Sequence, residues 1–288
     1  MSEERGREAM SGNGKTGDAE RPVAPRTVDL PTVRRIEALG FRAWPAASSV
    51  YDGSWLVRLT AGHPSRRLNS VNALDRMDAA DLEGRIARLA RKFAGYDRPL
   101  VFRQTPLAPP ALAEQLDREG WGHEGETIVM TGRAEEVADP DALDLLPVRD
   151  VGSFVDAAID VRPRARDYKS GLTELLTAIT PEKGMFVLAE SDEPTATALA
   201  VHDGEFTGLF EVATHPSQRG RGLGRTITRA AIKWAAARGA ERIWLQVEAD
   251  NDAALALYRG LGFSEAYRYH YRAAPDGPDR LDPAEELV

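Results

Sequence analysis

The sequence predicts a mixed α/β fold built from two blocks of similar architecture, and three observations lead to this prediction. Segments rich in β-type residues alternate with segments whose apolar residues recur at helical spacing along most of the 288-residue chain. A glycine-rich turn connects a predicted strand to a predicted helix in the C-terminal half. Finally, part of the order of elements and short motifs in the N-terminal half recurs in the C-terminal half, which indicates a diverged tandem repeat.

The composition is that of a soluble globular protein, with 42% hydrophobic and 28% charged residues. No apolar stretch approaches the roughly 20 residues that span a bilayer. The chain contains no cysteine, which excludes disulfides, thiolate catalysis and cysteine zinc sites. A net charge of −8 argues against broad nucleic-acid binding. We therefore expect a cytoplasmic protein, a monomer or homodimer, that has no membrane or nucleic-acid partner.

Two blocks lie between tails of low hydrophobicity. Residues 1–27 are rich in Gly, Ser, Glu, Arg and Pro and are expected to be disordered, and residues 274–288 resemble a loose acidic tail. The acidic segment 134–142 suits a linker between the blocks at 28–133 and 143–273. The first block predicts strands at 55–60, 100–104 and 127–130, and helices at 79–93 and 110–118. The second predicts helices at 151–160, 168–179, 223–238 and 252–260, and strands at 185–189, 197–202, 206–213, 242–247 and 263–271.

The most informative segment is the run from Gln218 to Gly224, between the strand at 206–213 and the helix at 223–238. A helix N-terminus offers unpaired N–H groups and a partial positive charge, and glycines let the backbone approach a ligand closely. The turn therefore predicts a pyrophosphate-bearing ligand. It lacks the lysine of a nucleotide P-loop, and its third glycine is misplaced for the dinucleotide fingerprint. A turn that only connects two elements is the alternative.

A second segment distinguishes among these ligands. Asn251 to Phe263 matches the pattern N-x-x-A-x-x-L-Y-x-x-x-G-F, and Arg219 to Gly224 matches R/Q-x-x-G-x-G/A. Together, and at this spacing, the two segments resemble the GNAT N-acetyltransferase superfamily over about residues 143–272. The resemblance implies tandem GNAT-like domains, the C-terminal one with splayed central strands and the N-terminal one degenerate.

The resemblance also implies a reaction, in which an amine attacks the acetyl group of acetyl-CoA directly in a ternary complex. The pantetheine arm would lie between the strands at 206–213 and 243–248, and a backbone amide there would stabilise the oxyanion. Tyr258 would donate a proton to the departing thiolate. The cofactor-binding residues implied in this way are Val212, Ala213, Thr214, Arg219, Gly220, Arg221, Gly222, Leu223, Gly224, Asn251 and Tyr258.

Several of these residues have a structural alternative. Asn251 is also a good helix N-cap, and Tyr258 would otherwise be a core tyrosine on an amphipathic helix. The position at which some family members carry a basic carboxylate is Gln246, which cannot act as a base. Glu248, on the same face of the strand, is the first candidate for the general base and Glu211 the second. Both would otherwise be solvated carboxylates at strand ends, and a water relay is a further route.

The remaining candidates point to no further cofactor. The histidines show no metal-ligand spacing, so no metal is expected, and His215 is best interpreted as a turn residue. In the first block, the run from Arg66 to Asn72 replaces the glycine run, so we expect that block to bind no cofactor. It either shapes the acceptor pocket or only buries a flank of the second block. The polar residues that would contact the acceptor are Arg58, Arg67, Asn69 and Asn72.

The acceptor itself is expected to be a small-molecule or peptide amine. A non-catalytic acyl-CoA sensor or interaction module is the alternative function, because Gln246 stands where a base is sometimes found.

Overall fold

The computed structural model describes residues 29–275, without the side chains of residues 163–165, and ten strands in this range form one continuous sheet. The predicted N-terminal tail and all but the start of the acidic tail lie outside the described residues. Across the sheet the strand order is β1-β2-β3-β4-β10-β5-β9-β8-β7-β6. The strands are β1 (Ser48–Asp52), β2 (Trp55–Leu59), β3 (Ser70–Ala73), β4 (Val101–Gln104), β5 (Gly122–Arg133), β6 (Glu182–Glu190), β7 (Glu193–Asp203), β8 (Phe206–Thr214), β9 (Arg242–Glu248) and β10 (Ser264–Ala273).

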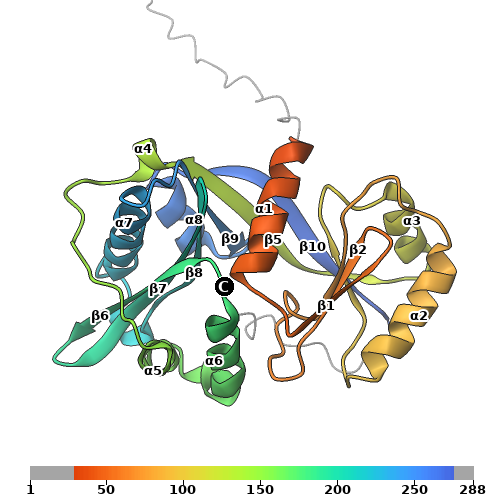
Figure 1. Cartoon of the computed structure of the whole chain (residues 1–288), viewed down its shortest axis with the longest axis horizontal. Helices are drawn as coiled ribbons and strands as arrows, with labels where there is room; N and C mark the ends of the chain where they lie inside the picture. Colours follow the sequence, from red (N-terminus) through yellow and green to blue (C-terminus); the bar gives the residue numbers. More distant parts are fainter. Residues whose placement is uncertain (1–28, 276–288) are drawn as a thin grey trace, which may run out of the picture.

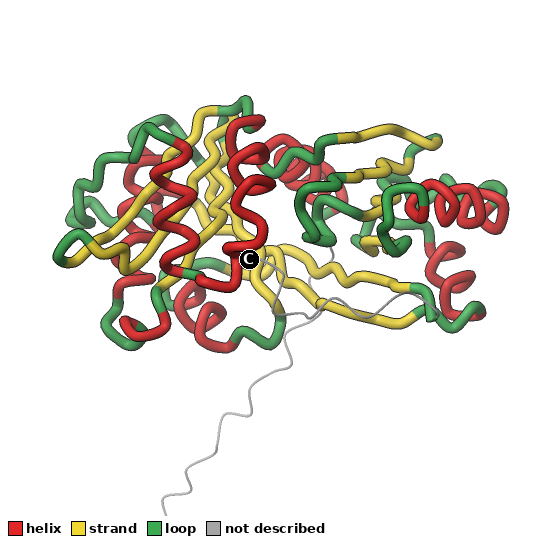
Figure 2. Tube along the Cα trace, turned by 90° about the horizontal axis from the view of Figure 1, so that it is seen from below, coloured by secondary structure: helices red, strands yellow, loops and turns green. Residues whose placement is uncertain are grey.

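Helices cover both faces of this sheet (Figures 1 and 2). The α-helices are α1 (Leu30–Ala43), α2 (Leu82–Ala94), α3 (Pro110–Arg118), α4 (Ala134–Val137), α5 (Val151–Val161), α6 (Lys169–Ala178), α7 (Leu223–Ala236) and α8 (Asp252–Arg259), and short 3₁₀ helices are η1 (Pro163–Tyr168) and η2 (Pro216–Gln218). One hydrophobic core joins α1, α5 and α6 to the middle of the sheet, a second joins α4, α7 and α8 to the C-terminal half, and a third joins α2 and α3 to the N-terminal half. The mixed α/β prediction is confirmed.

Each predicted strand and helix has a counterpart in the structure, and the sequence analysis missed α1, β1, β3 and α4 as well as the short helices η1 and η2. The apolar spacing in α7 buries Ile227, Ala231 and Ala235 against the sheet, as the helical period requires. The predicted linker at 134–142 is partly regular, because it begins with α4, where Ala134 and Val137 are buried.

The two halves of the sheet repeat one another in strand order and direction. From β1 to β4 and from β6 to β9, the successive pairings are antiparallel, antiparallel and parallel. The last strand of each half crosses to the other: β5 pairs with β9 and β10, and β10 pairs with β4 and β5. The tandem architecture predicted from the sequence is therefore present, and the two halves share one sheet at its centre.

Helices α3 and α8, which precede the exchanged strands, end in the same way. Gly120 and Gly262 both have left-handed φ angles, of 74° and 96°. The amide of the next residue then reaches back over the helix end: Trp121 N donates to Leu116 O at 3.0 Å, and Phe263 N donates to Tyr258 O at 3.0 Å. These matching hydrogen bonds align the end of α3 with the end of α8 residue by residue. In this alignment Leu116 of the first half corresponds to Tyr258 of the second.

The alignment corrects one interpretation of the sequence. The run from Arg66 to Asn72 follows β2 and continues into β3, so it corresponds to the turn between β7 and β8 and the start of β8, not to the glycine run. The segment 74–81, between β3 and α2, is the counterpart of the glycine run. The tripeptide His-Pro-Ser occurs at both 63–65 and 215–217, yet the first follows β2 and the second follows β8, so a short local motif does not fix the place of a loop in the topology.

Candidate active site

The two central strands of the C-terminal half separate part of the way along their length. Strands β8 and β9 pair in parallel from Phe206 with Arg242 to Leu209 with Leu245, and the pairing stops there although both strands continue. The predicted splay is therefore present. Phe210 and Gln246 are the first residues beyond the last pair, so they stand at the mouth of the opening.

A β-bulge in β8 follows at once. The register with β7 shifts between Leu199, opposite Phe210, and Thr197, opposite Ala213. Within the bulge, Glu211 has a φ of 50°, a left-handed conformation that costs a non-glycine residue roughly 1–2 kcal/mol. The Thr197 hydroxyl donates to the carbonyl of Glu211 at 3.0 Å and holds the bulge. The bulge turns the Glu211 side chain into the protein, where 1% of the residue is exposed.

The residues after the bulge remain paired on one side only. Ala213 and Thr214 pair with β7, whereas the edge of β8 that faces β9 is unpaired beyond Leu209. Backbone N–H and C=O groups along such an edge can accept an additional extended chain. The predicted pantetheine contacts at Val212, Ala213 and Thr214 lie along this edge and are half-buried.

The glycine run forms an open start for α7. Gly220 and Gly222 both have a φ of 78°, and no atom lies within 4 Å of a Cβ placed on either residue. The first backbone bond of the helix joins Thr226 N to Gly222 O at 3.0 Å. The amides of the first helical turn, including those of Leu223 and Gly224, therefore have no acceptor within the helix. A pyrophosphate fits this geometry, because space, amide donors and the positive end of the helix coincide.

The charged and polar residues around this start have defined partners. The exposed Arg221 forms a bidentate pair with Glu190 at 2.7 and 2.8 Å, whereas Arg219 is exposed at the edge of the turn. Asn251 accepts a hydrogen bond from Ala254 N at 3.1 Å and so caps α8, as the structural alternative predicts. His215 accepts from Ser217 N at 3.3 Å and is half-buried, in keeping with a turn residue.

Tyr258 lies on α8 and is packed against Phe263, with ring centroids 5.9 Å apart. Burial raises the pKa of Tyr258 above its ordinary value, and the positive charge of Arg162 partly opposes that rise. Because Arg162 also forms an ion pair with Glu211, one guanidinium links the electrostatics of both residues. The phenol therefore stays protonated at neutral pH, as a proton donor must.

Gln246 and Glu248 share one face of β9, as the strand period predicts. They alternate with Val247, which packs in the core beneath α7 and α8, so they face the side of the sheet covered by α1, α5 and α6. Gln246 Oε1 accepts a hydrogen bond from the Tyr269 hydroxyl at 2.7 Å. Glu248 is half-buried at the end of the strand. Glu211 Oε1 is buried and has no hydrogen-bond partner within residues 29–275.

The sequence analysis did not identify three residues that shape this site: Arg162, Glu37 and Phe210. Arg162 follows α5 and is far from Glu211 in the sequence, so no local pattern connects them. Asn69 and Asn72, predicted to contact the acceptor, are instead buried and bonded to the backbone, Asn69 to the carbonyls of His63 and Ser65. Arg58 and Arg67 do line a pocket that reaches β8 and β9.

Two kinds of feature are absent from residues 29–275. No group of three or more His, Asp or Glu side chains there is arranged to hold a metal ion. None of the helices in the same range has both the length and the apolar character needed to cross a membrane.

Comparison with known proteins agrees with the geometry of an acyl-transfer site. Residues 154–263 match the acetyltransferase (GNAT) family. The chain is 28% identical to the uncharacterized N-acetyltransferase YobR of Bacillus subtilis, over 83% of this chain and 98% of that protein. It is 37% identical to the [ribosomal protein bS18]-alanine N-acetyltransferase of Escherichia coli K12, over 32% of this chain and 63% of that protein.

A solved structure shows the same fold over most of the chain. The GCN5-related N-acetyltransferase from Kribbella flavida superposes with a TM-score of 0.65 at 21% identity, covering 85% of this chain and 96% of the other. The family match and the relatives thus identify an acetyltransferase. Residues 154–263 form a domain of the GNAT family, and acetyl transfer is the general reaction of that family.

Proposed function

We propose that the protein is an N-acetyltransferase that moves the acetyl group of acetyl-CoA to an amine by direct attack in a ternary complex. The observation that supports this proposal most is the coincidence of two openings. The open helix start at Gly222 and the unpaired edge of β8 lie next to one another, and a Cβ on Gly224 would be 3.3 Å from Thr214 Oγ1. One ligand can therefore place a pyrophosphate at the first opening and an extended arm along the second.

The bound acetyl-CoA would supply an activated acetyl thioester. The amides of Leu223 and Gly224 hold its pyrophosphate, and Arg219 and Arg221 add positive charge. Backbone groups of Val212, Ala213 and Thr214 hold the pantetheine arm, and an amide in this stretch stabilises negative charge on the carbonyl oxygen. Asn251 contacts the cofactor while it caps α8, and Tyr258 donates its proton to the sulfur.

Two carboxylates lie on the acceptor face of the sheet. An ammonium group must lose a proton before it attacks. Glu211 has one buried oxygen that no group of the described chain occupies, which suits it to receive that proton. Glu248, on the other splayed strand, is the second carboxylate within this face. We propose that one of them is the general base and that Gln246 orients the acceptor or its neighbours.

The test measures binding and turnover separately. Thermal shift with acetyl-CoA and with CoA reports binding, and release of free thiol with a panel of amines reports transfer. Glu211→Gln and Glu248→Gln each keep the shape of the side chain. The base variant should lower kcat by about 100-fold or more and shift the pH profile, whereas the other should not.

Two outcomes contradict the proposal. If acetyl-CoA stabilises the protein but no amine is turned over, the protein is a sensor and not an enzyme. If neither cofactor stabilises it, the cofactor site itself is wrong.

A further inference from the structure

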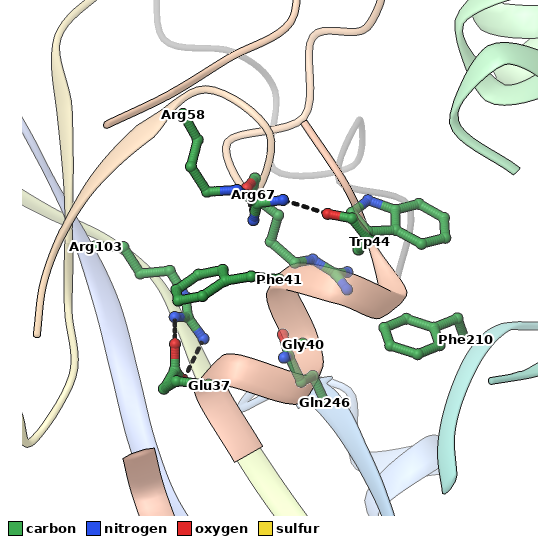
Figure 3. Close-up of a pocket in the computed structure, with 9 residues that line it drawn as sticks. All are labelled: Glu37, Gly40, Phe41, Trp44, Arg58, Arg67, Arg103, Phe210 and Gln246. Carbon is green, nitrogen blue, oxygen red and sulfur yellow. Dashed lines mark hydrogen bonds and ion pairs between the residues drawn. The ribbon is translucent and has the colours of Figure 1, made fainter. Parts of the chain in front are cut away.

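Several contacts fix the β-bulge at Glu211 beside the opening. Phe210, the residue before it, stacks on Trp44 at the end of α1, with ring centroids 5.5 Å apart and ring planes inclined by 9° (Figure 3). From the neighbouring strand, the Thr197 hydroxyl donates to the carbonyl of Glu211 at 3.0 Å. A left-handed backbone at a glutamate persists only where surrounding contacts enforce it, and strain of this kind is concentrated at functional sites. The contacts thus enforce a Glu211 carboxylate that points into the protein.

The burial of this carboxylate makes its charge depend on a nearby cation. The side chain of Glu211 is 1% exposed. A carboxylate that leaves water loses its hydration, and without a compensating charge it takes up a proton and becomes neutral. A neutral carboxyl group cannot accept a proton from an ammonium group. The group that holds Glu211 in its charged form therefore decides whether Glu211 can act as a base.

The cation beside Glu211 is Arg162. Its Nη2 atom donates a hydrogen bond to Oε2 of Glu211, and the two side chains form an ion pair. Among the side chains that the structure describes, no other charged group pairs with Glu211. The contact uses one carboxylate oxygen, whereas Oε1 is buried and has no hydrogen-bond partner within residues 29–275. The ion pair thus balances the charge of the carboxylate and leaves one oxygen for an acceptor.

The end of α5 places Arg162 at this position. Residue 163 is a proline, which has no amide proton to continue the helix and which disfavours helical backbone in the residue before it. Arg162 accordingly has a φ of −128° and a ψ of 81°. Helix α5 is itself anchored, because Phe154 and Ala158 belong to the same hydrophobic core as Phe210. The guanidinium group therefore reaches the bulge from an element outside both splayed strands.

The charge of Arg162 also acts on the opposite face of the sheet. Tyr258 belongs to the core formed with α7 and α8, whereas Phe210 belongs to the core formed with α1, α5 and α6. Burial raises the pKa of Tyr258, and the positive charge of Arg162 opposes that rise. One guanidinium group thus pairs with the candidate proton acceptor and acts electrostatically on the candidate proton donor.

We propose that Arg162 is a positioning residue for acetyl transfer, which keeps Glu211 in its charged form and directs Oε1 toward the acceptor. This inference rests on the proposed function and takes Glu211 as the general base. In that role, an N–H bond of the acceptor ammonium breaks as an O–H bond forms at Oε1, and the proton is later released to water. Arg162 acts through Glu211 and makes no bond to the reacting atoms.

A double-mutant cycle tests this inference by the rate of thiol release at saturating acetyl-CoA. Arg162→Gln should lower kcat by about 10-fold to 100-fold, since a hydrogen bond to a charged group contributes at that level. Arg162→Lys keeps the positive charge and should recover most of the loss. The double variant Arg162→Gln/Glu211→Gln should have the same kcat as Glu211→Gln alone, because Arg162 has no role once the carboxylate is removed.

Two controls separate the effect on catalysis from an effect on folding. Arg42→Gln removes an ion pair on α1 in which Arg42 contacts Asp203 at 2.7 Å, and it should leave kcat unchanged. A thermal shift with acetyl-CoA shows whether each variant keeps the cofactor site. If Arg162→Gln does not fold because Glu211 is left buried without a cation, the double variant removes both charges and still gives the comparison with Glu211→Gln.

Three kinetic results would overturn the inference. The first is a wild-type kcat in Arg162→Gln. The second is an equal loss of kcat when Arg162 is replaced in the wild-type protein and in Glu211→Gln, because Arg162 would then act independently of the carboxylate. The third is a change confined to the KM for the amine, which would make Arg162 a residue that binds the acceptor.

The charge of Glu211 can also be measured without turnover. If the wild type acetylates no amine although acetyl-CoA binds, the proposed transfer fails, and carbon NMR then tests the role of Arg162 alone. Protein labelled at the glutamate carboxyl carbons, with Glu211→Gln to assign the signal, distinguishes a charged from a neutral carboxyl group. At neutral pH, Glu211 should be charged in the wild type and neutral in Arg162→Gln. The same charge in both proteins would contradict the inference.

Discussion

Helices α2 and α7 occupy corresponding places in the two halves, yet their first turns differ in charge. Both follow a residue with a left-handed backbone, Asp81 with a φ of 49° and Gly222 with a φ of 78°. At α7 the space around that residue is open. At α2 the Asp81 carboxylate covers the first turn so closely that a Cβ on Gly84 would overlap it. In the first half, the carboxylate of Asp81 thus lies at the N-terminus of α2. The corresponding position at the N-terminus of α7 is open to an anionic ligand.

The loop before α2 strengthens this difference. Asp78 accepts hydrogen bonds from Ser54 N at 2.8 Å and Arg85 at 2.8 Å, and these contacts lower the pKa of its carboxyl group. Its negative charge persists at neutral pH and would repel a pyrophosphate. The expectation that the first half binds no cofactor is therefore supported by the segment at 74–81, not by the run at 66–72 from which it was inferred. The comparison teaches that a helix start binds phosphate only where the chain leaves it unoccupied.

Exchanging the residue that precedes each helix should give the largest effect. Gly222→Asp introduces the residue of the first half, and aspartate tolerates the left-handed region better than most residues. Its carboxylate would face the pyrophosphate. Two unit charges 4 Å apart repel by about 4 kcal/mol at an effective dielectric of 20, so the Kd for acetyl-CoA should rise by about 100-fold or more. Isothermal titration calorimetry measures this change.

The reciprocal variant is the control. Asp81→Gly removes the carboxylate from the first half and an exposed pair with Arg88, and it should leave the affinity of the second half for acetyl-CoA unchanged. If Gly222→Asp binds acetyl-CoA as tightly as the wild type, the pyrophosphate does not lie at the start of α7.

A second difference separates α3 from α8. Leu116 is fully buried and stands where the second half carries Tyr258. Tyr258→Phe keeps the ring that packs against Phe263 and removes the hydroxyl, so kcat should fall by about 100-fold or more while acetyl-CoA affinity is little changed. Thiol-release kinetics measure the loss. Tyr96→Phe, at a tyrosine that is 45% exposed, should have no effect. A Tyr258→Phe variant with wild-type kcat would leave Tyr258 as a core residue only.

The features that could be predicted from the sequence are the helix bounds that depend on nearby residues. The bounds of α3 were predicted residue by residue, because prolines precede it and glycine ends it. The first residue of α7, Leu223, was predicted from the helical spacing of the apolar residues that follow it. Helix α1 was missed although Val33, Ile36 and Leu39 recur at helical spacing, because the segment adjoins a polar tail.

Contacts between distant segments could not be predicted in this way. Glu37 meets Tyr267 from the other end of the chain, and Glu211 meets Arg162 only because a bulge turns it inward. Neither contact leaves a pattern in a single sequence. The exchange of β5 and β10 is of the same kind, because strand pairing across the sheet depends on long-range packing. The splayed strands were anticipated only through the family resemblance.

The smallest expected effect is a change in stability at the helix ends that the two halves have in common. Gly120 and Gly262 end α3 and α8, and alanine at either position costs about 1 kcal/mol, since the left-handed backbone penalty exceeds the gain from a stiffer unfolded chain. The nearest atom to a Cβ on Gly262 is Val137 Cγ1 at 3.5 Å, and no atom lies within 4 Å at Gly120, so neither substitution meets a clash. Urea unfolding should give equal losses for the two variants. Gly95→Ala, at a helix end with a φ of −65°, should be neutral or stabilising. If the losses in the free energy of unfolding differed by more than about 1 kcal/mol between the two variants, the two helix ends would not contribute equally to stability, despite their shared hydrogen bonds.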